Sequence, residues 1–517
     1  MPLAQHLLLT LYYVLLAAVV TVMLYRGLLI VRYWRLPRRD PEPAARFAQP
    51  PVVTVQLPIF NEQFVVERLL EGVCALDWPR DRLEVQLLDD STDGTVAIAA
   101  RKVAELRARG FDVKHLHRTD RSGYKAGALR AATPQARGDL LAVFDADFVP
   151  QPDFLRRLVD HFTDPTVGFV QARWGYFNRE HSFLTQGMGM LMDGHFVLEQ
   201  VTRARSGCVF NFNGTGGIWR RQAIEQAGGW HDDTICEDTD LSYRTYMAGW
   251  RGVYLRDVAC PSEVPVVVSA LKTQQHRWAK GLTECFVKLM PRLWASSLPI
   301  KAKIEGTMHL GANLAFPASL FLTILAVPVL MLRMHGITAG PLAMAAETAA
   351  FSLVIVSQVL FYVVATRELH RDWLRRLVWL PAPALVGVGL AVNNTRGVLE
   401  ALTGHKTEFV RTPKLGVAEG DRSEARQRAA VYKARSARAQ GLFEVGLAAL
   451  YVLLAVMQLR VSVAGALVTA FLGVGLFVLG GSSLRSLLVP AAGPAPRPRP
   501  DAAPAGVLAP AAGTAEG

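Results

Sequence analysis

Long apolar stretches occur near both ends of the chain. Residues 7–31 contain no acidic residue, and the one basic residue among them, Arg26, lies near the end of the stretch. A helix of this length crosses a hydrocarbon layer of about 30 Å. The alternative is a cleaved signal peptide, but a basic N-terminal region and a clear cleavage site are both missing, which favours a retained anchor. The same pattern predicts further membrane-spanning helices at 310–332, 346–366, 442–457 and 463–480.

A cluster of arginines follows the first apolar stretch and predicts its orientation. Basic residues collect on the cytoplasmic side of membrane proteins. With five spans, residues 32–308 and 367–441 lie on the same side, and we expect that side to be the cytoplasm. The arginines of the cluster are Arg32, Arg35, Arg38 and Arg39.

One more apolar stretch, residues 377–392, is broken by Pro381 and Pro383. If this stretch crossed the membrane, the basic segment 396–440 would be exported, against the charge rule. The pattern therefore favours an interfacial or re-entrant helix.

Between the apolar stretches, residues 50–260 alternate between strand-like and helix-like patterns. The runs VVTVQLPIF, LEVQLLDD, FDVKHLH and DLLAVFDAD predict strands, whereas TVAIAARKVAELRARG has helical apolar spacing and ends on glycine. This alternation predicts an α/β domain with a mostly parallel sheet. In such sheets, ligands bind beyond the carboxyl ends of the strands.

The composition agrees with a membrane protein, since 51% of the 517 residues are hydrophobic and only 19% are charged. Basic loops beside anionic headgroups, such as DRSEARQRAAVYKARSARAQ, explain the net charge of +12. Nucleic-acid binding is the weaker alternative, and we expect no nucleic-acid partner. The five cysteines show neither CxxC nor His-paired spacing, which fits a reducing cytoplasm and predicts no structural metal. The tail is rich in Ala, Pro and Gly and is expected to be disordered.

Acidic residues lie at two of the predicted strand ends: Asp89 and Asp90 at one, Asp145 and Asp147 at the other. An Asp-x-Asp sequence there offers hard oxygen ligands for Mg2+ or Mn2+. Such an ion would neutralise a diphosphate leaving group. The alternative is a turn with two solvated acids, because Asp-x-Asp is short and common.

Glu237 and Asp238 lie at the predicted start of a helix that ends near Gly249. A carboxylate at this place can accept a proton from a sugar hydroxyl as a general base. The alternative is purely structural, since acidic residues favour helix N-termini. Lys125, between two glycines in RSGYKAGAL, could approach a phosphate, although a lone lysine in a loop is usually just solvated.

In the sequence QQHRW, helical spacing places Gln274, Arg277 and Trp278 on one face. An arginine fork suits a phosphate, and an indole offers a flat surface for a pyranose ring together with an N–H donor. The alternative is an ordinary amphipathic helix at a membrane surface.

In order along the chain, LLDDSTDGT, RSGYKAGAL, FDADF, FNGTGGIWR, CEDTDLSYR and QQHRW resemble the motifs of processive family 2 glycosyltransferases, the membrane-embedded cellulose synthase-like group. The series covers residues 50 to 280. Its wording, which also includes QARW (171–174) and AGGW (227–230), is closer to plant-type mannan and glucan backbone synthases and their bacterial relatives than to bacterial cellulose synthase. The resemblance implies a GT-A-like, nucleotide-sugar-binding α/β domain inserted between transmembrane helices.

The resemblance also implies a role for each motif. Asp238 would be the catalytic base, positioned with Glu237, and Asp145 and Asp147 would hold Mg2+ or Mn2+. The residues implied to bind the donor are Asp89, Asp90, Lys125, Asp145, Asp147, Arg277, Thr412 and Lys414. Those implied to bind the acceptor are Gln274, Trp278, Phe212, Asn213, Gly214 and Thr215.

Two details differ from the cellulose synthase pattern. The segment FVRTPK, Phe409 to Lys414, resembles the gating loop F-x-V-T-x-K, but Arg411 replaces its valine. Cys236 replaces the usual threonine of the TED motif. Neither change removes a catalytic carboxylate. A nucleotide-sensing domain of the cellulose-synthase type is not found after the spans, so we expect no regulation by a cyclic dinucleotide.

Together these patterns predict seven regions along the chain. They are an N-terminal transmembrane helix (1–35), a GT-A-like catalytic domain (50–260), amphipathic interfacial helices with QQHRW (261–308), two transmembrane helices (309–366), an interfacial helix with the gating-loop segment (367–441), two more transmembrane helices (442–482) and the disordered tail (483–517).

The resemblance implies an inverting hexosyltransferase of an inner, plasma or Golgi-type membrane. It would transfer hexose from GDP-mannose or UDP-glucose to a growing β-1,4-linked polysaccharide and translocate the polymer. Its partners would be the nucleotide sugar, the polysaccharide acceptor and the lipid membrane, and further subunits are left open. One alternative is a non-processive enzyme that adds a sugar to a lipid acceptor, but such enzymes typically lack the Gln-Arg-Trp motif. Another is a transporter or structural membrane protein with a degenerate enzyme domain, which would have lost one of four key acids. All four are present: Asp90, Asp145, Asp147 and Asp238.

Overall fold

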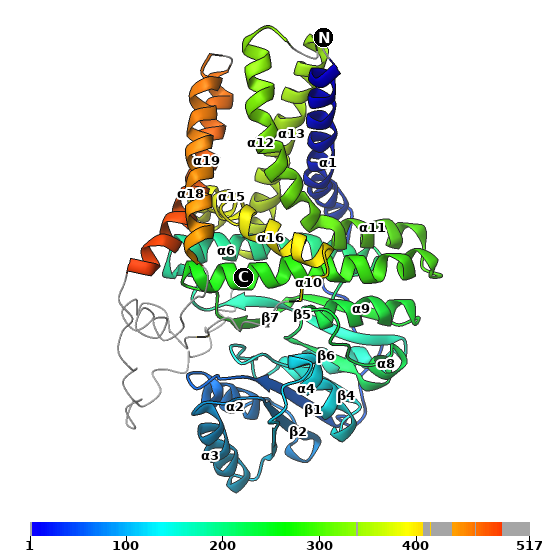
Figure 1. The fold of residues 1–517 in the computed structure, drawn as a ribbon. Coiled ribbons are helices and arrows are strands. Elements are labelled where there is room, and N and C mark those ends of the chain that lie inside the picture. Colours follow the sequence, from blue (N-terminus) through cyan, green and yellow to red (C-terminus); the bar gives the residue numbers. More distant parts are fainter. Residues whose placement is uncertain (1–2, 338–339, 407–413, 415–436, 461, 489–517) are drawn as a thin grey trace.

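The computed structural model describes residues 3–337, 340–406, 414, 437–460 and 462–488. Figure 1 shows three layers: a sheet with its helices at the bottom, a layer of helices above it and a bundle of long helices at the top. Arg411 and Thr412 of the predicted gating-loop segment lie outside the described residues, as does the tail from residue 489.

Seven strands form one sheet in the order β3-β2-β1-β4-β6-β5-β7. β6 runs antiparallel to β4 and β5, and the other neighbours are parallel, which confirms the predicted mostly parallel sheet. Val53 of β1 aligns with Leu83 of β2 and Leu140 of β4, so the carboxyl ends of these strands meet at one edge. The bounds are β1 Val53–Ile59, β2 Leu83–Asp89, β3 Asp112–His117, β4 Leu140–Val143, β5 Val167–Tyr176, β6 Gly217–Arg220 and β7 Arg251–Ser262.

Apolar side chains cover both faces of this sheet. Val55 and Leu57 of β1 pack into one core with α2 and α3, whereas Leu141 and Val143 of β4 pack into a second core with α4. Burial on both faces fixes the register, because a slip by one residue would exchange the two faces. The helices next to the sheet are α2 Val66–Cys74, α3 Thr95–Ala108, α4 Tyr124–Ala132, α5 Phe154–Leu158, α8 Arg221–Gln226 and α9 Glu237–Met247.

A layer of helices separates the sheet from the bundle (Figure 1). Gly281 of α10 lies so close to the start of α9 that a Cβ atom there would come within 2.5 Å of the sulfur of Cys236. The absence of a side chain therefore lets the QQHRW helix approach the Glu237–Asp238 end of α9. The layer consists of α6 Phe183–Asp193, the π-helical segment η5 Gly194–Gln200, α7 Val201–Arg205, α10 Val268–Ala295, α11 Ile300–Gly311 and α16 Ala391–Leu402.

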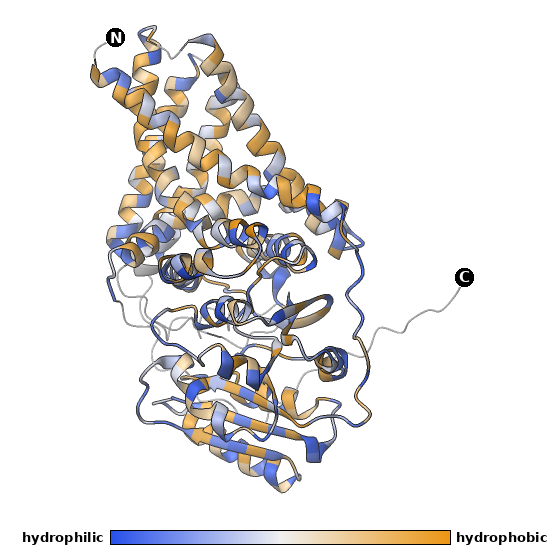
Figure 2. Cartoon of the chain, turned by 90° about the vertical axis from the view of Figure 1, so that its right-hand side faces the viewer, coloured by the Kyte–Doolittle hydropathy of each residue, from blue (hydrophilic) through white to orange (hydrophobic). Residues whose placement is uncertain are grey.

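Among the residues that the structure describes, five helices are long and apolar enough to cross a membrane, and they cover the five predicted spans. Hydrophobic colouring dominates these helices in Figure 2, and many of their large apolar side chains are exposed, which indicates an integral membrane protein. The helical stretch Trp373–Gly389 meets α16 at a bend of 43°, the form of a broken span or of a re-entrant loop such as the one predicted. The helices of the bundle are α1 Leu3–Trp34, α12 Ala315–Met334, α13 Pro341–Leu369, α18 Ala437–Gln458 and α19 Val463–Leu488, joined by the short α14 Trp373–Arg376 and α15 Pro381–Gly389. Because α19 continues to Leu488, the first residues of the predicted disordered tail are helical.

A buried cation ties the bundle to the middle layer. Lys272 of α10 is 8% exposed and pairs with the carboxylate of Glu444 on α18, which is fully buried. The same ammonium donates a hydrogen bond of 2.8 Å to the hydroxyl of Ser483 on α19. These contacts hold the helix that carries QQHRW against the last two membrane helices.

Candidate active site

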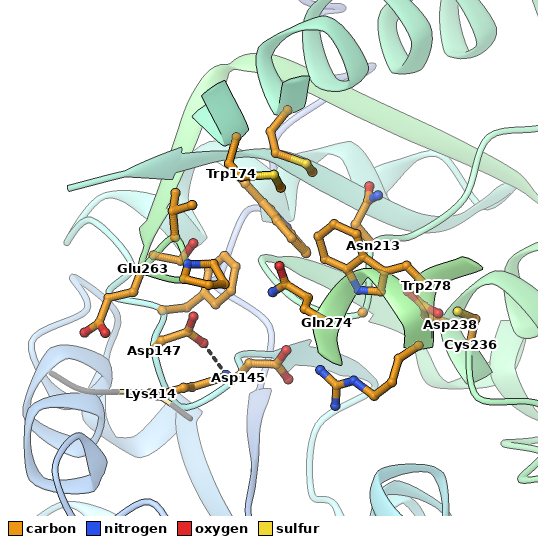
Figure 3. Close-up of a pocket in the computed structure, with 18 of the residues that line it drawn as sticks. Asp145, Asp147, Trp174, Asn213, Cys236, Asp238, Glu263, Gln274, Trp278 and Lys414 are labelled. Atoms are coloured by element: carbon orange, nitrogen blue, oxygen red, sulfur yellow. Dashed lines mark hydrogen bonds and ion pairs between the residues drawn. The ribbon is translucent and has the colours of Figure 1, made fainter. Parts of the chain in front are cut away.

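A cavity lies between the carboxyl edge of the sheet and α10 (Figure 3). Its walls include residues from β5, the loop after β4, the FNGT segment, the start of α9 and one face of α10. The structure thereby brings together predicted residues from distant parts of the chain: Lys125, Asp145, Asp147, Asn213, Gly214, Glu237, Asp238, Gln274, Arg277, Trp278 and Lys414.

The Asp-x-Asp acids follow β4 and each contact one ammonium group. Lys125 Nζ lies 2.7 Å from Asp145 Oδ1. Lys414 Nζ pairs with Asp147 Oδ1, as the dashed line in Figure 3 marks. Burial raises the pKa of Asp145, but Lys125 and Lys414 outweigh burial and lower it below its ordinary value. This carboxyl group is therefore ionised at neutral pH.

These two carboxylates fit a divalent cation. Mg2+ and similar ions are commonly held by one or two carboxylates together with substrate phosphates, rather than by a cage made only of protein groups. Asp145 is ionised, and Asp145 and Asp147 both line the cavity, where a diphosphate could complete the ligand set. The two ammonium groups supply the positive charge that these acids require in a partly buried site.

Two clusters elsewhere in the described chain bring three possible ligand atoms within 4.8 Å of one another. In the second cluster the ammonium of Lys288 contacts all three groups, at 3.2, 2.6 and 2.9 Å. The clusters are Asp89 with His115 and His117, and His231 with Asp233 and Asp240.

Lys125 links the metal-binding half of the cavity to the acids of α9. Besides Asp145, its ammonium donates to the backbone oxygen of Gly214 at 2.8 Å and lies 3.6 Å from Glu237 Oε1. Burial lowers the pKa of Lys125, but the surrounding carboxylates raise it above its ordinary value. Gly214 has φ of +78°, and a Cβ atom on it would lie 3.2 Å from Asp238 Oδ2, so glycine suits this crowded left-handed position.

Glu237 and Asp238 begin α9, and both line the cavity. Asp238 Oδ1 accepts a hydrogen bond of 2.8 Å from the backbone N–H of Thr239. Burial and the neighbouring Glu237 carboxylate raise the pKa of Asp238 to about 7, against the opposing ammonium of Lys125. Burial also raises the pKa of Glu237. A carboxyl group whose pKa lies near neutrality suits a general base.

The predicted face of α10 forms the opposite wall, where Gln274, Arg277 and Trp278 all line the cavity. Trp174 of β5 approaches Trp278, with ring centroids 6.3 Å apart and the planes tilted by 55° (Figure 3). The two indoles give this end of the cavity an aromatic surface of the kind that binds sugar rings.

Two residues of the FNGT segment line the cavity, and the other two lie behind its wall. Asn213 and Gly214 face the cavity, whereas Phe212 is fully buried against Trp219 with ring centroids 5.1 Å apart. The hydroxyl of Thr215, also fully buried, accepts a hydrogen bond of 2.8 Å from the backbone N–H of Asp145. The structure thus places Phe212 and Thr215 behind the wall, where they hold the lining residues.

Asp89 and Asp90 lie outside the lining. Asp89 is fully buried and accepts hydrogen bonds of 2.8 Å from the Ser91 backbone N–H and from His115. Asp90 forms a two-pronged ion pair with Arg118, at 2.8 and 2.6 Å. A donor base that reached Asp90 would therefore meet the Arg118 guanidinium as well.

Several lining residues carry no motif that would identify them in the sequence. Trp174 ends the sequence QARW, for which the resemblance implied no role, and the path of β5 brings its side chain to the cavity. Cys236, noted in the sequence as a replacement for threonine, also lines the cavity, and burial raises the pKa of its thiol. Phe148, the last residue of FDADF, also lines the cavity. Other lining residues that lie outside the motifs are Tyr176, Met188, Met192, Glu263 and Pro265.

Two family models match this part of the chain. Glycosyl transferase family 2 matches residues 54–225, and Glycosyl transferase family group 2 matches residues 140–392. Together they contain every lining residue named above except Lys414.

Curated relatives match the same part of the chain. Glucomannan 4-beta-mannosyltransferase 1 of Oryza sativa subsp. japonica is 41% identical over 264 residues, which are 50% of this chain and 51% of the rice protein. Glucomannan 4-beta-mannosyltransferase 2 of Arabidopsis thaliana is 42% identical over 245 residues, 46% of each protein. The match therefore spans about half the length of these relatives.

A solved structure shows the same fold. A mannosyltransferase from Pyrobaculum calidifontis, in complex with GDP-Man and Mn2+, superimposes with a TM-score of 0.54 at 24% identity, over 77% of this chain and 100% of that one. The likeness confirms the predicted GT-A-like α/β core.

Proposed function

From the premise that residues 54–392 carry a family 2 glycosyltransferase region, we propose that the protein is a membrane-embedded inverting hexosyltransferase. It extends a β-1,4-linked polysaccharide from a nucleotide sugar and moves the polymer into the membrane. The observation that supports this most directly is the meeting of three groups in one cavity: the acids after β4, the acids that begin α9 and the QQHRW face of α10.

In this proposal the donor diphosphate lies beside Asp145 and Asp147. Lys125, Arg277 and Lys414 line the same part of the cavity and supply positive charge for the phosphates. A divalent cation bound by the two aspartates would add charge neutralisation for the departing diphosphate. Asp90 and Arg118 would hold the nucleoside part of the donor beyond this cavity.

Asp238 takes the proton of the acceptor hydroxyl. Its raised pKa means that the ionised carboxylate has a strong affinity for a proton and yet is well populated just above neutrality. The freed oxygen attacks the anomeric carbon from the side opposite the diphosphate. A single displacement inverts that centre, so an α-linked donor gives a β-linkage.

The acceptor sugar stacks at the aromatic end of the cavity, against Trp278. The helix that carries Trp278 lies directly below the membrane bundle in Figure 1, so a growing chain would meet the membrane helices next. This placement favours polymer extension over transfer of one sugar to a lipid. It also requires that the catalytic domain face the cytoplasm, where nucleotide sugars are available.

Of the two donors that the sequence leaves open, we propose GDP-mannose with Mn2+. The matching plant relatives are named glucomannan mannosyltransferases, and the solved neighbour holds GDP-Man and Mn2+. UDP-glucose with Mg2+ is the competing pair.

The test uses membranes that contain the full chain, incubated with labelled GDP-mannose or UDP-glucose and with Mn2+ or Mg2+. The proposal predicts label from GDP-mannose in a polymer that β-mannanase digests. A glucanase-sensitive polymer from UDP-glucose would overturn the donor assignment alone. Label that extracts into organic solvent would overturn polymer synthesis, and no transfer from either donor would overturn the proposed function.

A further inference from the structure

The side-chain amide of Asn213 is held at both ends on the wall of the cavity. Its Oδ1 lies 2.7 Å from Gln200 Nε2, and its Nδ2 lies 3.2 Å from His195 Nε2. Its backbone N–H donates to Gln171 Oε1 at 2.9 Å. Figure 3 shows Asn213 at the end of the cavity occupied by Trp278. These contacts restrict the orientation of the Asn213 amide, unlike that of an exposed asparagine in a surface loop.

The orientation of this amide follows from a backbone group. Gln200 Nε2 lies 3.0 Å from the backbone oxygen of Asn211, which can only accept a hydrogen bond. The nitrogen of Gln200 is therefore the donor, and the group of Asn213 that faces it must be the oxygen. The NH2 group of Asn213 then faces His195, whose Nε2 must act as acceptor.

The same reasoning fixes the protonation state of His195. Since Nε2 accepts, the ring is neutral and carries its proton on Nδ1, which donates to Glu199 Oε2 at 3.0 Å. Burial raises the pKa of Glu199, but His195, Arg203 and Arg26 outweigh burial and lower it below its ordinary value. The carboxylate is thus an acceptor that sets the tautomer of the ring.

Charged groups from three other helices enclose this cluster. Arg203 of α7 lies 3.5 Å from Glu199, and Arg26 of α1 lies 3.4 Å from it. Arg203 also pairs with Glu305 of α11 at 3.3 Å. His195 and Glu199 both lie in the π-helical segment η5, a form of helix that is rare and often found at functional sites. The network therefore extends from a membrane helix to the wall of the cavity.

We propose that His195 is a positioning residue for the acceptor sugar, a role that rests on the proposed function. Glu199 holds the ring of His195, and the ring in turn fixes the side-chain amide of Asn213. One N–H and one oxygen lone pair of that amide are not used by Gln200 or His195. These two groups then point in fixed directions into the acceptor half of the cavity. Sugar hydroxyls both donate and accept, so a fixed amide can select their arrangement around the ring. A rotated amide would present the two groups in exchanged places.

The test compares His195→Ala with His195→Gln in the full chain, reconstituted in lipid. Glutamine can place an oxygen where Nε2 stands and so retains an acceptor for Asn213, whereas alanine cannot. The rate of hexose transfer is measured against the concentration of a β-1,4-linked oligosaccharide acceptor and, separately, of the donor. His335→Ala, at an exposed position between α12 and α13, is the matched control.

Loss of one hydrogen bond between neutral groups predicts that His195→Ala raises the acceptor KM roughly 3- to 10-fold with the donor KM unchanged. His195→Gln should restore most of the affinity, and His195→Ala combined with Asn213→Ala should be no worse than Asn213→Ala alone. An unchanged acceptor KM, an equal rise in the donor KM, or effects that multiply in the double variant would each overturn the role of His195.

A binding measurement separates this role from the proposed function. Quenching of tryptophan fluorescence by β-1,4-linked mannohexaose or cellohexaose reports on the acceptor half without any transfer. If wild type transfers no sugar yet binds the hexasaccharide more tightly than His195→Ala, the proposed function fails and the positioning role stands. If wild type transfers sugar and the variants bind equally, only the positioning role fails. If wild type does neither, both fail.

Discussion

The ammonium group of Lys125 lies 2.7 Å from Asp145 and 3.6 Å from Glu237, and so joins the two acidic halves of the cavity. The loop after β4 and the start of α9 are far apart in the sequence. The Lys125 ammonium between them offsets part of the repulsion among their carboxylates. Burial and the negative charge of Glu237 nevertheless raise the pKa of Asp238. The electrostatics of this cavity therefore predict how the enzyme responds to pH.

Transfer should increase as pH rises through about 7, because only the ionised form of Asp238 can accept the proton of the acceptor. Below that pH the carboxyl is protonated and the rate falls about tenfold for each unit. Above it the rate levels off. The measurement is kcat/KM against pH between about pH 5 and 9, because this ratio reports the pKa of the free enzyme.

Lys125→Met should move this midpoint to higher pH, because the Lys125 ammonium lowers the pKa of Asp238. Residual transfer is sufficient to determine the midpoint, even though the variant also loses a contact with the donor. A midpoint that stayed in place, or moved toward acid, would contradict the electrostatic account.

Trp278→Ala should shorten the polymer and raise the acceptor KM roughly 10-fold, equal to about 1.4 kcal/mol, because the sugar loses its stacking surface. Trp294→Ala is the matched control, since Trp294 lies on the same helix and is 47% exposed. Product length is read by gel filtration or mass spectrometry. Equal chain lengths in the two variants would argue against Trp278 as the acceptor platform.

Asp147→Asn should raise the Mn2+ concentration needed for half-maximal transfer by at least about 10-fold. Changes to groups that merely support metal ligands already cost about 10- to 100-fold in metal affinity. The control is Asp153→Asn, at an exposed position beyond the cavity. Chelation should stop transfer in wild type, and added Mn2+ should restore it. An unchanged Mn2+ requirement in Asp147→Asn would exclude Asp147 as a ligand.

Lys272→Met should destabilise the protein by about 3 kcal/mol, because it leaves Glu444 buried without its cation. Adding Glu444→Gln removes that charge and should recover much of the loss. Thermal unfolding in detergent measures both, with the exposed Lys406→Met as control. A double variant no more stable than Lys272→Met would show that the Lys272–Glu444 ion pair does not hold α10 against the last two helices.

Local patterns in the sequence were sufficient to predict β1 to β4 and the five long apolar helices, whereas β5, β6 and β7 were not predicted. β1, β2 and β4 were visible as short apolar runs, and parallel strands necessarily place their ends at one edge. For this reason Asp89, Asp90, Asp145 and Asp147 could be assigned to one edge of the sheet. The acids of α9 begin a helix, and only the family resemblance placed them in the same site.

Contacts between distant segments could not be read from the sequence. Adjacent strand residues point to opposite faces, and the structure shows Asp89 paired with His115 while Asp90 meets Arg118, 28 residues further along. Neither partner carries a motif. Trp174 belongs to QARW, but the resemblance implied no role for it, and its contact with Trp278 depends on how β5 and α10 pack in the fold.

The most direct test of the account is Asp238→Asn, measured for transfer and for binding of the nucleoside diphosphate. Asparagine keeps the size of the side chain but cannot take a proton, so transfer should fall by about 100-fold or more while nucleotide binding is retained. Glu225→Gln, whose side chain is 61% exposed, should match wild type in both. Transfer by Asp238→Asn at the wild-type rate would contradict the central claim that this carboxylate is the catalytic base.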